Sequence, residues 1–314
     1  MAAGQCTAAR TPTGLRKLLI RTICRCRSAH ASRHPTHQKP RPTGGYPLAR
    51  SPSRPELPAV ICYTVAMNEK DQLQETQYDF PYHFIPQVHE GAIVTNQHLQ
   101  WAMMYLGYMQ TVRDAVIESG VTSVLDVGCG DGRFAYELEQ VDSSIRYHGI
   151  DISERALHFA RGFTTRSTFA VFDIIEQPYP ELYDAITYIE TIEHIEPTRI
   201  KPMVANMAAS LKPNGLLFLT TPTTNVPTHQ KHYQHFTREM IEEYLGEHFT
   251  ITSVRYLNVE SVLAKTLARL LVNRLLIVQP AWWRRLIFEL YQRYCLVGTE
   301  KTGSRIFVTA RKQA

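Results

Sequence analysis

Two clusters of acidic and histidine side chains could transfer a proton or hold a metal ion. The first is Glu190-Thr-Ile-Glu-His194, and the second lies in the histidine-rich run 228–237. Imidazole titrates near neutral pH, so His232 or His194 could remove the proton of a hydroxyl group on a substrate. Together with Glu190 and Glu193, these histidines also make an oxygen and nitrogen set suited to a divalent ion. We expect His232 to act as a base without a metal ion.

A glycine-rich loop could bring the backbone close to a ligand. The apolar run Val121–Val127 leads into Gly128-Cys-Gly-Asp-Gly132, and a helix is expected to begin at Arg133. Glycines permit the sharp turn, and the N–H groups that begin the helix point toward the loop. Because position 133 is Arg, the glycine fingerprint of dinucleotide enzymes is incomplete.

Acidic residues stand beside this loop and at the end of the next apolar run. Asp126 precedes the loop by two residues, and Asp151 follows Gly132 by 19 residues, within Tyr147–Ile152. A carboxylate at the tip of a second parallel strand can accept hydrogen bonds from both hydroxyls of a ribose. The spacing therefore indicates a nucleoside-containing ligand.

These motifs resemble the core of the class I S-adenosylmethionine-dependent methyltransferases over residues 121–222. The resemblance is carried by five motifs in order: Val-Leu-Asp-Val-Gly-Cys-Gly-Asp-Gly, Gly-Ile-Asp-Ile-Ser at 149–153, Phe-Asp-Ile at 172–174, Tyr-Asp-Ala-Ile-Thr-Tyr-Ile-Glu at 183–190, and Leu-Lys-Pro-Asn-Gly-Leu-Leu-Phe-Leu-Thr-Thr-Pro at 211–222. It implies S-adenosyl-L-methionine as cofactor. It also implies an α/β fold, a Rossmann-like doubly wound seven-stranded sheet with a helical cap.

The resemblance also implies which residues meet the cofactor. Asp126, Gly128 and Gly130 would line the methionine moiety. Asp151 would hold the ribose, and Asp173 and Ile174 the adenine. The full implied cofactor-binding set is Asp126, Gly128, Gly130, Gly132, Asp151, Ile152, Asp173, Ile174 and Glu190, and the expected catalytic set is His232, His194 and Glu190.

The elements that must position these residues follow from periodicity. Trp101, Tyr105, Tyr108, Val112 and Val116 recur at helical spacing, so a helix is expected over 97–118. Apolar runs then alternate with helical patterns, which is typical of βαβ units and a parallel sheet. The remaining predicted elements are a helix at 238–246 with Thr237 as its N-cap, and strands at 249–257 and 305–311.

The predicted domain organisation has three parts. Residues 1–66 are rich in Pro, Arg, His, Ser and Thr, and we expect a disordered or targeting extension. Residues 67–120 form an N-terminal cap segment and helix. Residues 121–314 form the methyltransferase domain, with a helical insertion at about 258–300.

Charge and cysteine content exclude several classes of protein. Residues 67–254 hold 12 basic and 25 acidic side chains, which argues against a nucleic-acid partner. Residues 255–314 hold 11 basic and 3 acidic side chains, so the segment 262–288 could contact a membrane surface. No apolar run reaches 18 residues, so no transmembrane segment is expected. Six scattered cysteines predict neither a disulfide framework nor a structural zinc site.

The sequence as a whole predicts a methyltransferase acting on a small-molecule or saccharide-type acceptor through oxygen. The alternatives are a metal-dependent RNA 3′-terminal ribose 2′-O-methyltransferase, a quinone-pathway O-methyltransferase, and a binding module of the same fold without turnover. We expect a cytoplasmic protein, or one in the mitochondrial matrix if residues 1–55, with 11 basic and no acidic side chains, act as a presequence. The oligomeric state is left open.

Overall fold

The structure of the protein is a computed structural model that describes Lys70 and residues 86–89, 92–95, 99–272, 278 and 280–313. The expected extension over residues 1–66 lies outside the described residues. The helices and strands are, in chain order, β1 Pro86–His89, β2 Ala92–Thr95, α2 Leu99–Glu118, β3 Ser123–Val127, α3 Arg133–Val141, β4 Arg146–Asp151, α4 Glu154–Phe163, β5 Thr168–Val171, β6 Tyr183–Ile189, the 3₁₀ helix η2 Ile192–His194, α5 Pro197–Ala209, β7 Leu211–Pro222, α6 Arg238–Leu245, β8 Phe249–Val259, α7 Val262–Leu271, α8 Ala281–Tyr294, β9 Val297–Gly298 and β10 Gly303–Lys312.

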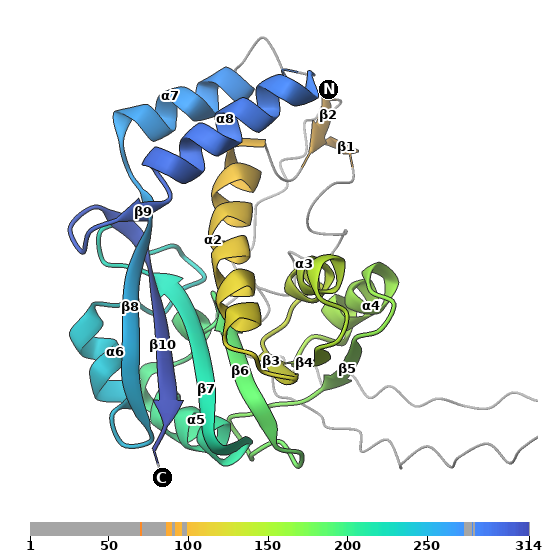
Figure 1. Cartoon of the computed structure of the whole chain (residues 1–314), viewed down its shortest axis with the longest axis vertical. Helices are drawn as coiled ribbons and strands as arrows, with labels where there is room; N and C mark the ends of the chain where they lie inside the picture. The colour runs from red at the N-terminus through yellow and green to blue at the C-terminus, as the bar shows by residue number, and fades with distance from the viewer. Residues whose placement is uncertain are drawn as a thin grey trace, which may run out of the picture. The chain divides into compact units, whose positions relative to one another are not determined.

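A mixed sheet organises the fold, with strand order β5-β4-β3-β6-β7-β10-β8-β9 (Figure 1). β3 pairs in parallel with β4 on one side and β6 on the other, whereas β10 runs antiparallel to both β7 and β8. The chain order therefore reverses direction at β3 and β6. In open α/β sheets such a reversal opens a ligand crevice at the carboxyl ends of the strands.

The expected doubly wound α/β fold is confirmed, but the predicted number of strands is wrong. The sheet has eight strands because the chain leaving α8 adds a two-residue strand, β9, to the edge of β8. Tyr256 and Leu257 pair with Gly298 and Val297 in this register. Two residues give no periodic sequence signal, so this strand could not be predicted from pattern.

Each face of the sheet is covered by its own helices. Successive strand residues point to opposite faces, so neighbouring residues enter different cores. Val124 belongs to the core shared with α2 and α3, and the next residue, Leu125, belongs to the core shared with α5 and α6. On the first face, Val112 and Val116 of α2 are fully buried. In this part of α2, the helical spacing of the apolar residues reflects their packing against the sheet.

Helices α7 and α8 lie side by side across one end of α2 (Figure 1). Leu267 and Leu271 of α7 share a buried cluster with Ile287 of α8 and Met103 of α2. The first helix of the expected insertion at about 258–300 is short, because α7 ends at Leu271 and Val272 is extended. Within the described residues, no helix combines the length and hydropathy that crossing a bilayer requires.

Candidate functional site

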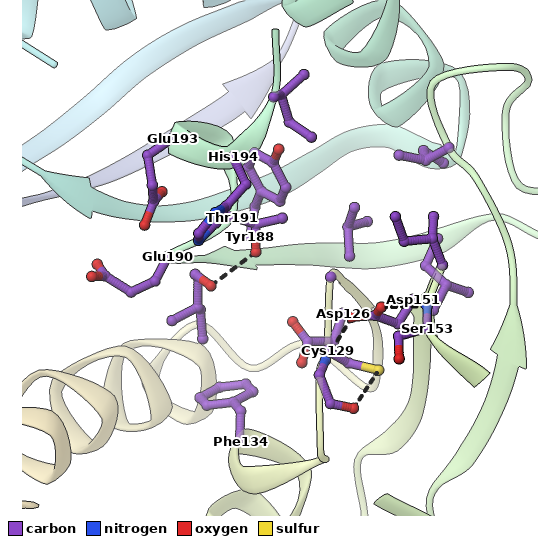
Figure 2. Close-up of a pocket in the computed structure, with 18 of the residues that line it drawn as sticks. Asp126, Cys129, Phe134, Asp151, Ser153, Tyr188, Glu190, Thr191, Glu193 and His194 are labelled. Carbon is purple, nitrogen blue, oxygen red and sulfur yellow. Dashed lines mark hydrogen bonds between the residues drawn. The ribbon is translucent and has the colours of Figure 1, made fainter. Parts of the chain in front are cut away.

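A pocket of about 600 Å³ lies at the carboxyl ends of the parallel strands (Figure 2). Its volume is in the range of small-molecule sites. All of the cofactor-binding and catalytic residues expected from the sequence line it except Gly132, which holds the base of the loop. The lining members of that set are Asp126, Gly128, Gly130, Asp151, Ile152, Asp173, Ile174, Glu190, His194 and His232.

The glycine-rich loop takes a conformation that favours glycine. Gly128, Gly130 and Gly132 have φ of 72°, 54° and 80°, in the left-handed region that side chains disfavour. A Cβ on Gly128 would lie 2.5 Å from Cγ2 of Thr191, the second residue after β6. The loop therefore packs directly against the chain that carries the predicted catalytic residues.

Asp151, at the end of β4, holds the loop and the next helix together. Its Oδ2 accepts a hydrogen bond from the Gly130 N–H at 2.9 Å, and its Oδ1 accepts one from the Ser153 N–H at 2.8 Å. Ser153 caps α4 by accepting from the Ala156 N–H at 3.1 Å. The carboxylate is thus fixed at the pocket edge by backbone donors.

Asp126 forms the floor of the pocket and has an unusual protonation behaviour. Its side chain accepts hydrogen bonds from the hydroxyls of Tyr147 and, at 2.7 Å, Thr187. Burial, only partly offset by these bonds, raises the pKa of Asp126 to about 7. Because both oxygens bond within the protein, Asp126 orders strands β3, β4 and β6 around the pocket.

A third acidic residue lies farther along the pocket, after β5. Asp173 accepts a hydrogen bond from the Ile175 N–H at 2.9 Å, and Arg199 of α5 lies 3.9 Å from its Oδ2. Ile152, Phe172 and Ile174 supply apolar lining on this side. The apolar lining next to a carboxylate suits a planar heterocycle.

Glu190 begins the opposite side of the pocket and is held by an arginine that the sequence did not single out. Its backbone is left-handed, with φ of 51°, and its Oε2 accepts from Nε of Arg305 at 2.8 Å. Burial and Glu190 act in opposite directions on Arg305, and the net effect raises its pKa. Arg305 also stacks over the Tyr108 ring, 4.8 Å from its centroid. The sequence showed Arg305 only as the first residue of the strand expected over 305–311, which also contains Arg311, and gave no sign of its partner.

The histidines on this side are oriented by hydrogen bonds to backbone carbonyls. His194 Nδ1 donates to the Lys231 carbonyl at 3.3 Å, and His235 Nδ1 donates to the Val226 carbonyl at 3.0 Å. The other nitrogen of His235, Nε2, lies 2.9 Å from Nδ1 of His232 and can accept there, since Nδ1 of His235 already donates. We infer that His232 carries its hydrogen on Nδ1 and keeps the lone pair on Nε2.

Glu193, His194 and His232 converge, whereas Glu190 is engaged by Arg305. One ligand atom of each of the three lies within 4.8 Å of the others. Burial and Glu190 raise the pKa of Glu193 well above its ordinary value. Burial lowers the pKa of His194 to about 3 and of His232 to about 2. Both imidazoles are neutral at pH 7, as either a proton acceptor or a metal ligand must be.

Aromatic side chains of α2 form a further wall of the pocket. The Trp101 and Tyr105 rings stack with centroids 4.3 Å apart, and Tyr105 meets Tyr108 edge-on at 5.5 Å. Lys70 also lines the pocket, and its Nζ donates to the carbonyl of His232 at 2.7 Å. The helical spacing of the aromatic residues predicted the helix but gave no sign that one side would line a site.

Comparison with known proteins identifies the family. A family described as "Methyltransferase domain" matches residues 65–260. The chain therefore belongs to this family, the class I S-adenosylmethionine-dependent methyltransferases. The family, the class of enzyme and the cofactor that the motifs predicted are confirmed.

Curated relatives align with the central part of the chain. The Ubiquinone biosynthesis O-methyltransferase of Proteus mirabilis (strain HI4320) is 31% identical over 127 residues, which cover 38% of this chain and 49% of the relative. The protein of the same name from Thiobacillus denitrificans (strain ATCC 25259 / T1) is 33% identical over 113 residues, covering 34% and 47%. The chain thus spans about half the length of the curated relatives it matches.

Solved structures resemble the chain at low identity. The N-methyltransferase NodS from Bradyrhizobium japonicum WM9, in complex with S-adenosyl-L-homocysteine, has 18% identity and a TM-score of 0.46, covering 67% of this chain and 87% of that one. The methyltransferase domain of bacterial CtHen1-C has 17% identity and a TM-score of 0.47, covering 67% and 100%. Both TM-scores lie below 0.5. The fold is defined instead by the strand order of the sheet and by the family match.

The chemistry of the pocket fits a cationic methyl donor. S-adenosylmethionine carries a positive sulfonium, and its electrophilic methyl group is what it supplies when bound. Within the described residues, Oε1 of Glu190 is buried without a hydrogen-bond partner, and Glu190 is one of the residues that line the pocket. A buried carboxylate oxygen of this kind is stabilised by a cation.

Proposed function

We propose that the protein transfers a methyl group to a hydroxyl of a small-molecule or saccharide-type acceptor. The observation that carries the proposal is the pair of neutral imidazoles, His194 and His232, beside Glu190 at one pocket. In each imidazole the hydrogen-bonded nitrogen is Nδ1, which leaves the Nε2 lone pair available. The names of the curated relatives, which are O-methyltransferases, agree with an oxygen acceptor.

The cofactor would lie across the glycine-rich loop. In this proposal Gly128 and Gly130 let the backbone approach the methionine moiety, and Asp151 accepts hydrogen bonds from the ribose hydroxyls. Asp173, Ile152 and Ile174 would contact the adenine. Glu190 would face the sulfonium through its unpartnered oxygen, so its charge would act where the methyl group is transferred.

His232 is the proposed proton acceptor, with His194 beside it. As an acceptor oxygen begins to bond the methyl carbon, its hydroxyl proton becomes strongly acidic. An imidazole of low pKa can then take this proton, provided that its lone pair already points at the hydroxyl. His235 supports that orientation, because its hydrogen bond keeps the hydrogen of His232 on Nδ1.

The lining of the acceptor side favours a ring-bearing molecule. Trp101 and Tyr105 offer stacked aromatic faces, and Glu190 and His232 are also part of the lining. Sugar and phenol rings both present an apolar face to an aromatic wall and a hydroxyl at their edge. This supports a saccharide-type acceptor, and it equally supports the quinone-pathway alternative.

A metal-dependent reaction is the second candidate, favoured by the convergence of Glu193, His194 and His232. Metal-bound histidines usually donate their other N–H to a carbonyl or another acceptor, as both histidines do here. A divalent ion held by these three residues would orient and acidify an acceptor hydroxyl. This candidate would include a terminal ribose of RNA among the acceptors.

Methyl transfer assayed with and without chelator separates the two candidates. The purified chain is incubated with methyl-labelled S-adenosylmethionine and, separately, with a metabolite extract, a polysaccharide extract and a short RNA. Mass spectrometry then identifies the labelled product. We expect a labelled metabolite or saccharide, full activity in EDTA, and loss of turnover in His232→Ala. Loss in EDTA with recovery in magnesium or manganese would support the metal, and labelled RNA alone would overturn the small-molecule proposal.

A further inference from the structure

The outer end of the α7–α8 hairpin exposes apolar and basic side chains together. We define this end, the hairpin tip, as Arg269, Leu270, Trp282, Arg285 and Leu286. Leu270, Trp282 and Leu286 are 42%, 67% and 40% exposed, and both arginines are exposed. Trp282 and Leu286 are four residues apart in α8, so they lie on one side of the helix.

Helices α7 and α8 pack firmly on the protein through other side chains. The residues that follow Leu270 and Leu286, namely Leu271 and Ile287, are buried at 4% and 1% exposure in the cluster shared with α2. Trp283 donates its indole N–H to the Leu270 carbonyl at 3.1 Å, which joins the start of α8 to the end of α7. The tip therefore carries apolar side chains beyond those needed to hold the two helices on the protein.

The charge around the tip differs from that of the central region of the chain. Residues 261–288 contain five Lys and Arg and no Asp or Glu. Residues 67–254 contain 12 basic and 25 acidic side chains. A negatively charged surface would thus repel the central region and attract this hairpin, which favours an approach with the hairpin facing such a surface.

We propose that the hairpin tip docks onto an anionic lipid bilayer. Trp282 would lie at the headgroup level, where indole is favoured, and Leu270 and Leu286 would enter the acyl boundary. Arg269 and Arg285 would keep their guanidinium groups among the lipid phosphates while their methylene stems cover apolar surface. This inference rests on the surface alone and is independent of the methyl acceptor.

The exposed apolar side chains favour a bilayer over a nucleic acid. Phosphate backbones are bound by basic side chains, and leucines on the same surface would gain nothing from that contact. In a bilayer, by contrast, leucine and tryptophan lose contact with water while arginine meets phosphate. Leu270 and Leu286 therefore decide between two polyanionic partners that arginines alone would not distinguish.

Vesicle co-sedimentation with the full chain tests the proposal. We expect the protein to bind phosphatidylcholine vesicles that contain phosphatidylglycerol, and to bind pure phosphatidylcholine vesicles much more weakly. The double variant Trp282→Glu, Leu286→Glu should lower the affinity at least about tenfold, because it places charges in the acyl boundary. Arg285→Glu should lower the affinity by on the order of tenfold or more, and should reduce its salt dependence.

Matched controls place the same substitutions away from the tip. Leu182→Glu replaces a leucine that is 48% exposed near β6, and Lys201→Glu reverses an exposed charge on α5. Both should bind vesicles like the unmodified chain. Every variant is checked by thermal melting, so that loss of fold is not mistaken for loss of docking.

Three outcomes would overturn the proposal. Equal binding to neutral and anionic vesicles would remove the role of the arginines. Unchanged binding in the tip variants would assign any vesicle affinity to another part of the chain, such as the basic residues 1–55. Binding of a short RNA that competes with the vesicles, and that is lost with Arg285→Glu but not with the Trp282 and Leu286 changes, would assign the surface to nucleic acid.

Discussion

Four carboxyl groups of the pocket differ because their surroundings differ. Asp151 accepts two backbone N–H bonds, whereas Asp126 is buried with hydroxyl partners only, and burial raises the pKa of Asp126. Glu190 faces a guanidinium, and Glu193 lies buried beside Glu190. The carboxyl groups held by backbone or guanidinium donors, Asp151 and Glu190, therefore lie on opposite sides of the pocket, where the proposed function needs them.

Asp126→Asn should raise the free energy of unfolding, compared with the unmodified chain, and the gain should be larger at neutral pH than at acidic pH. Burial raises the pKa of Asp126 from 3.8 to about 7, so the folded state holds a proton that the unfolded state releases. The stability that this proton provides is complete below pH 3.8 and is lost as pH rises through about 7, which amounts to on the order of 4 kcal/mol. Asn accepts from the Thr187 hydroxyl through its oxygen and donates through its amide to the Tyr147 oxygen, which reverses that hydrogen bond, and it does not titrate.

Thermal melts of the ligand-free protein from pH 4 to pH 8 measure this effect. The Tm of Asp126→Asn minus the Tm of the unmodified chain should increase as the pH rises. Asp142→Asn is the control, since Asp142 is exposed and its hydrogen bonds to Ser144 lower its pKa. A difference in Tm that stays constant across this range would show that Asp126 ionises as it does in water.

His235 should matter to turnover although it does not line the pocket. His235→Ala leaves Nδ1 of His232 without its acceptor, so both orientations of the imidazole hydrogen become populated. We expect kcat to fall about 10- to 100-fold with a smaller change in KM. His235→Gln, which retains an acceptor, should recover part of kcat.

The surface variant His158→Ala, on α4, serves as the matched control for His235. His158 is exposed and its Nε2 lies 4.0 Å from Oε1 of Glu154, so its removal should leave kcat unchanged. If His235→Ala and His235→Gln lose the same activity, the hydrogen bond to His232 has no part in orienting the base.

At the scale of elements, the site depends on the contact between two loops, one after β3 and one after β6. Gly128 and Thr191 touch at this contact, and Gly128 and Cys129 both donate to the Ile150 carbonyl of β4, at 2.8 and 3.1 Å. The glycine-rich loop is thus fixed between the strands that carry Asp151 and Glu190. Its conformation should be sensitive to a single added methyl group.

Gly128→Ala should weaken cofactor binding by at least about tenfold. The added Cβ would lie 2.5 Å from Thr191 Cγ2, and φ of 72° is strained for alanine by about 1 kcal/mol or more. The double variant Gly128→Ala, Thr191→Ala should recover part of the loss, because it removes the closest atoms but not the backbone strain. Titration calorimetry with S-adenosylhomocysteine measures both; no recovery at all would mean that the contact with Thr191 is irrelevant.

The elements that bear local patterns were predictable from the sequence, and the contacts between distant residues were not. The predicted N-cap of α6 is confirmed, since Thr237 accepts from the Met240 N–H at 3.3 Å. The residues of α2 and the strand ends near Asp151 and Glu190 were also placed correctly. The pairing of Arg305 with Glu190 joins positions 115 residues apart, and only the antiparallel insertion of β10 beside β7 brings them together.

The whole molecule combines an acidic central region with basic segments on either side in the sequence. Residues 1–55 and 255–314 each hold 11 basic side chains, whereas 67–254 hold 25 acidic ones. The described pocket draws its residues from position 70 onward. Cofactor binding and methyl transfer should therefore not require the first 66 residues.

Removing residues 1–66 should leave both methyl transfer and Tm unchanged. The segment lacks a periodic apolar pattern with which to join a core, apart from a short run near Leu15–Ile23. A chain that begins at Met67 is compared with the full chain by thermal melting and by the labelled-cofactor assay. A fall of several degrees in Tm would show that these residues pack against the methyltransferase domain.

The most direct test of the account is calorimetric titration of S-adenosylhomocysteine into the unmodified chain and into Asp151→Ala and Gly130→Val. Asp151 is expected to hold the ribose, and Gly130, with φ of 54°, to let the loop pass beneath the methionine moiety. We predict binding by the unmodified chain and no measurable binding by either variant, with both variants still melting cooperatively. Unchanged affinity in either folded variant would contradict the assignment of this pocket as the cofactor site.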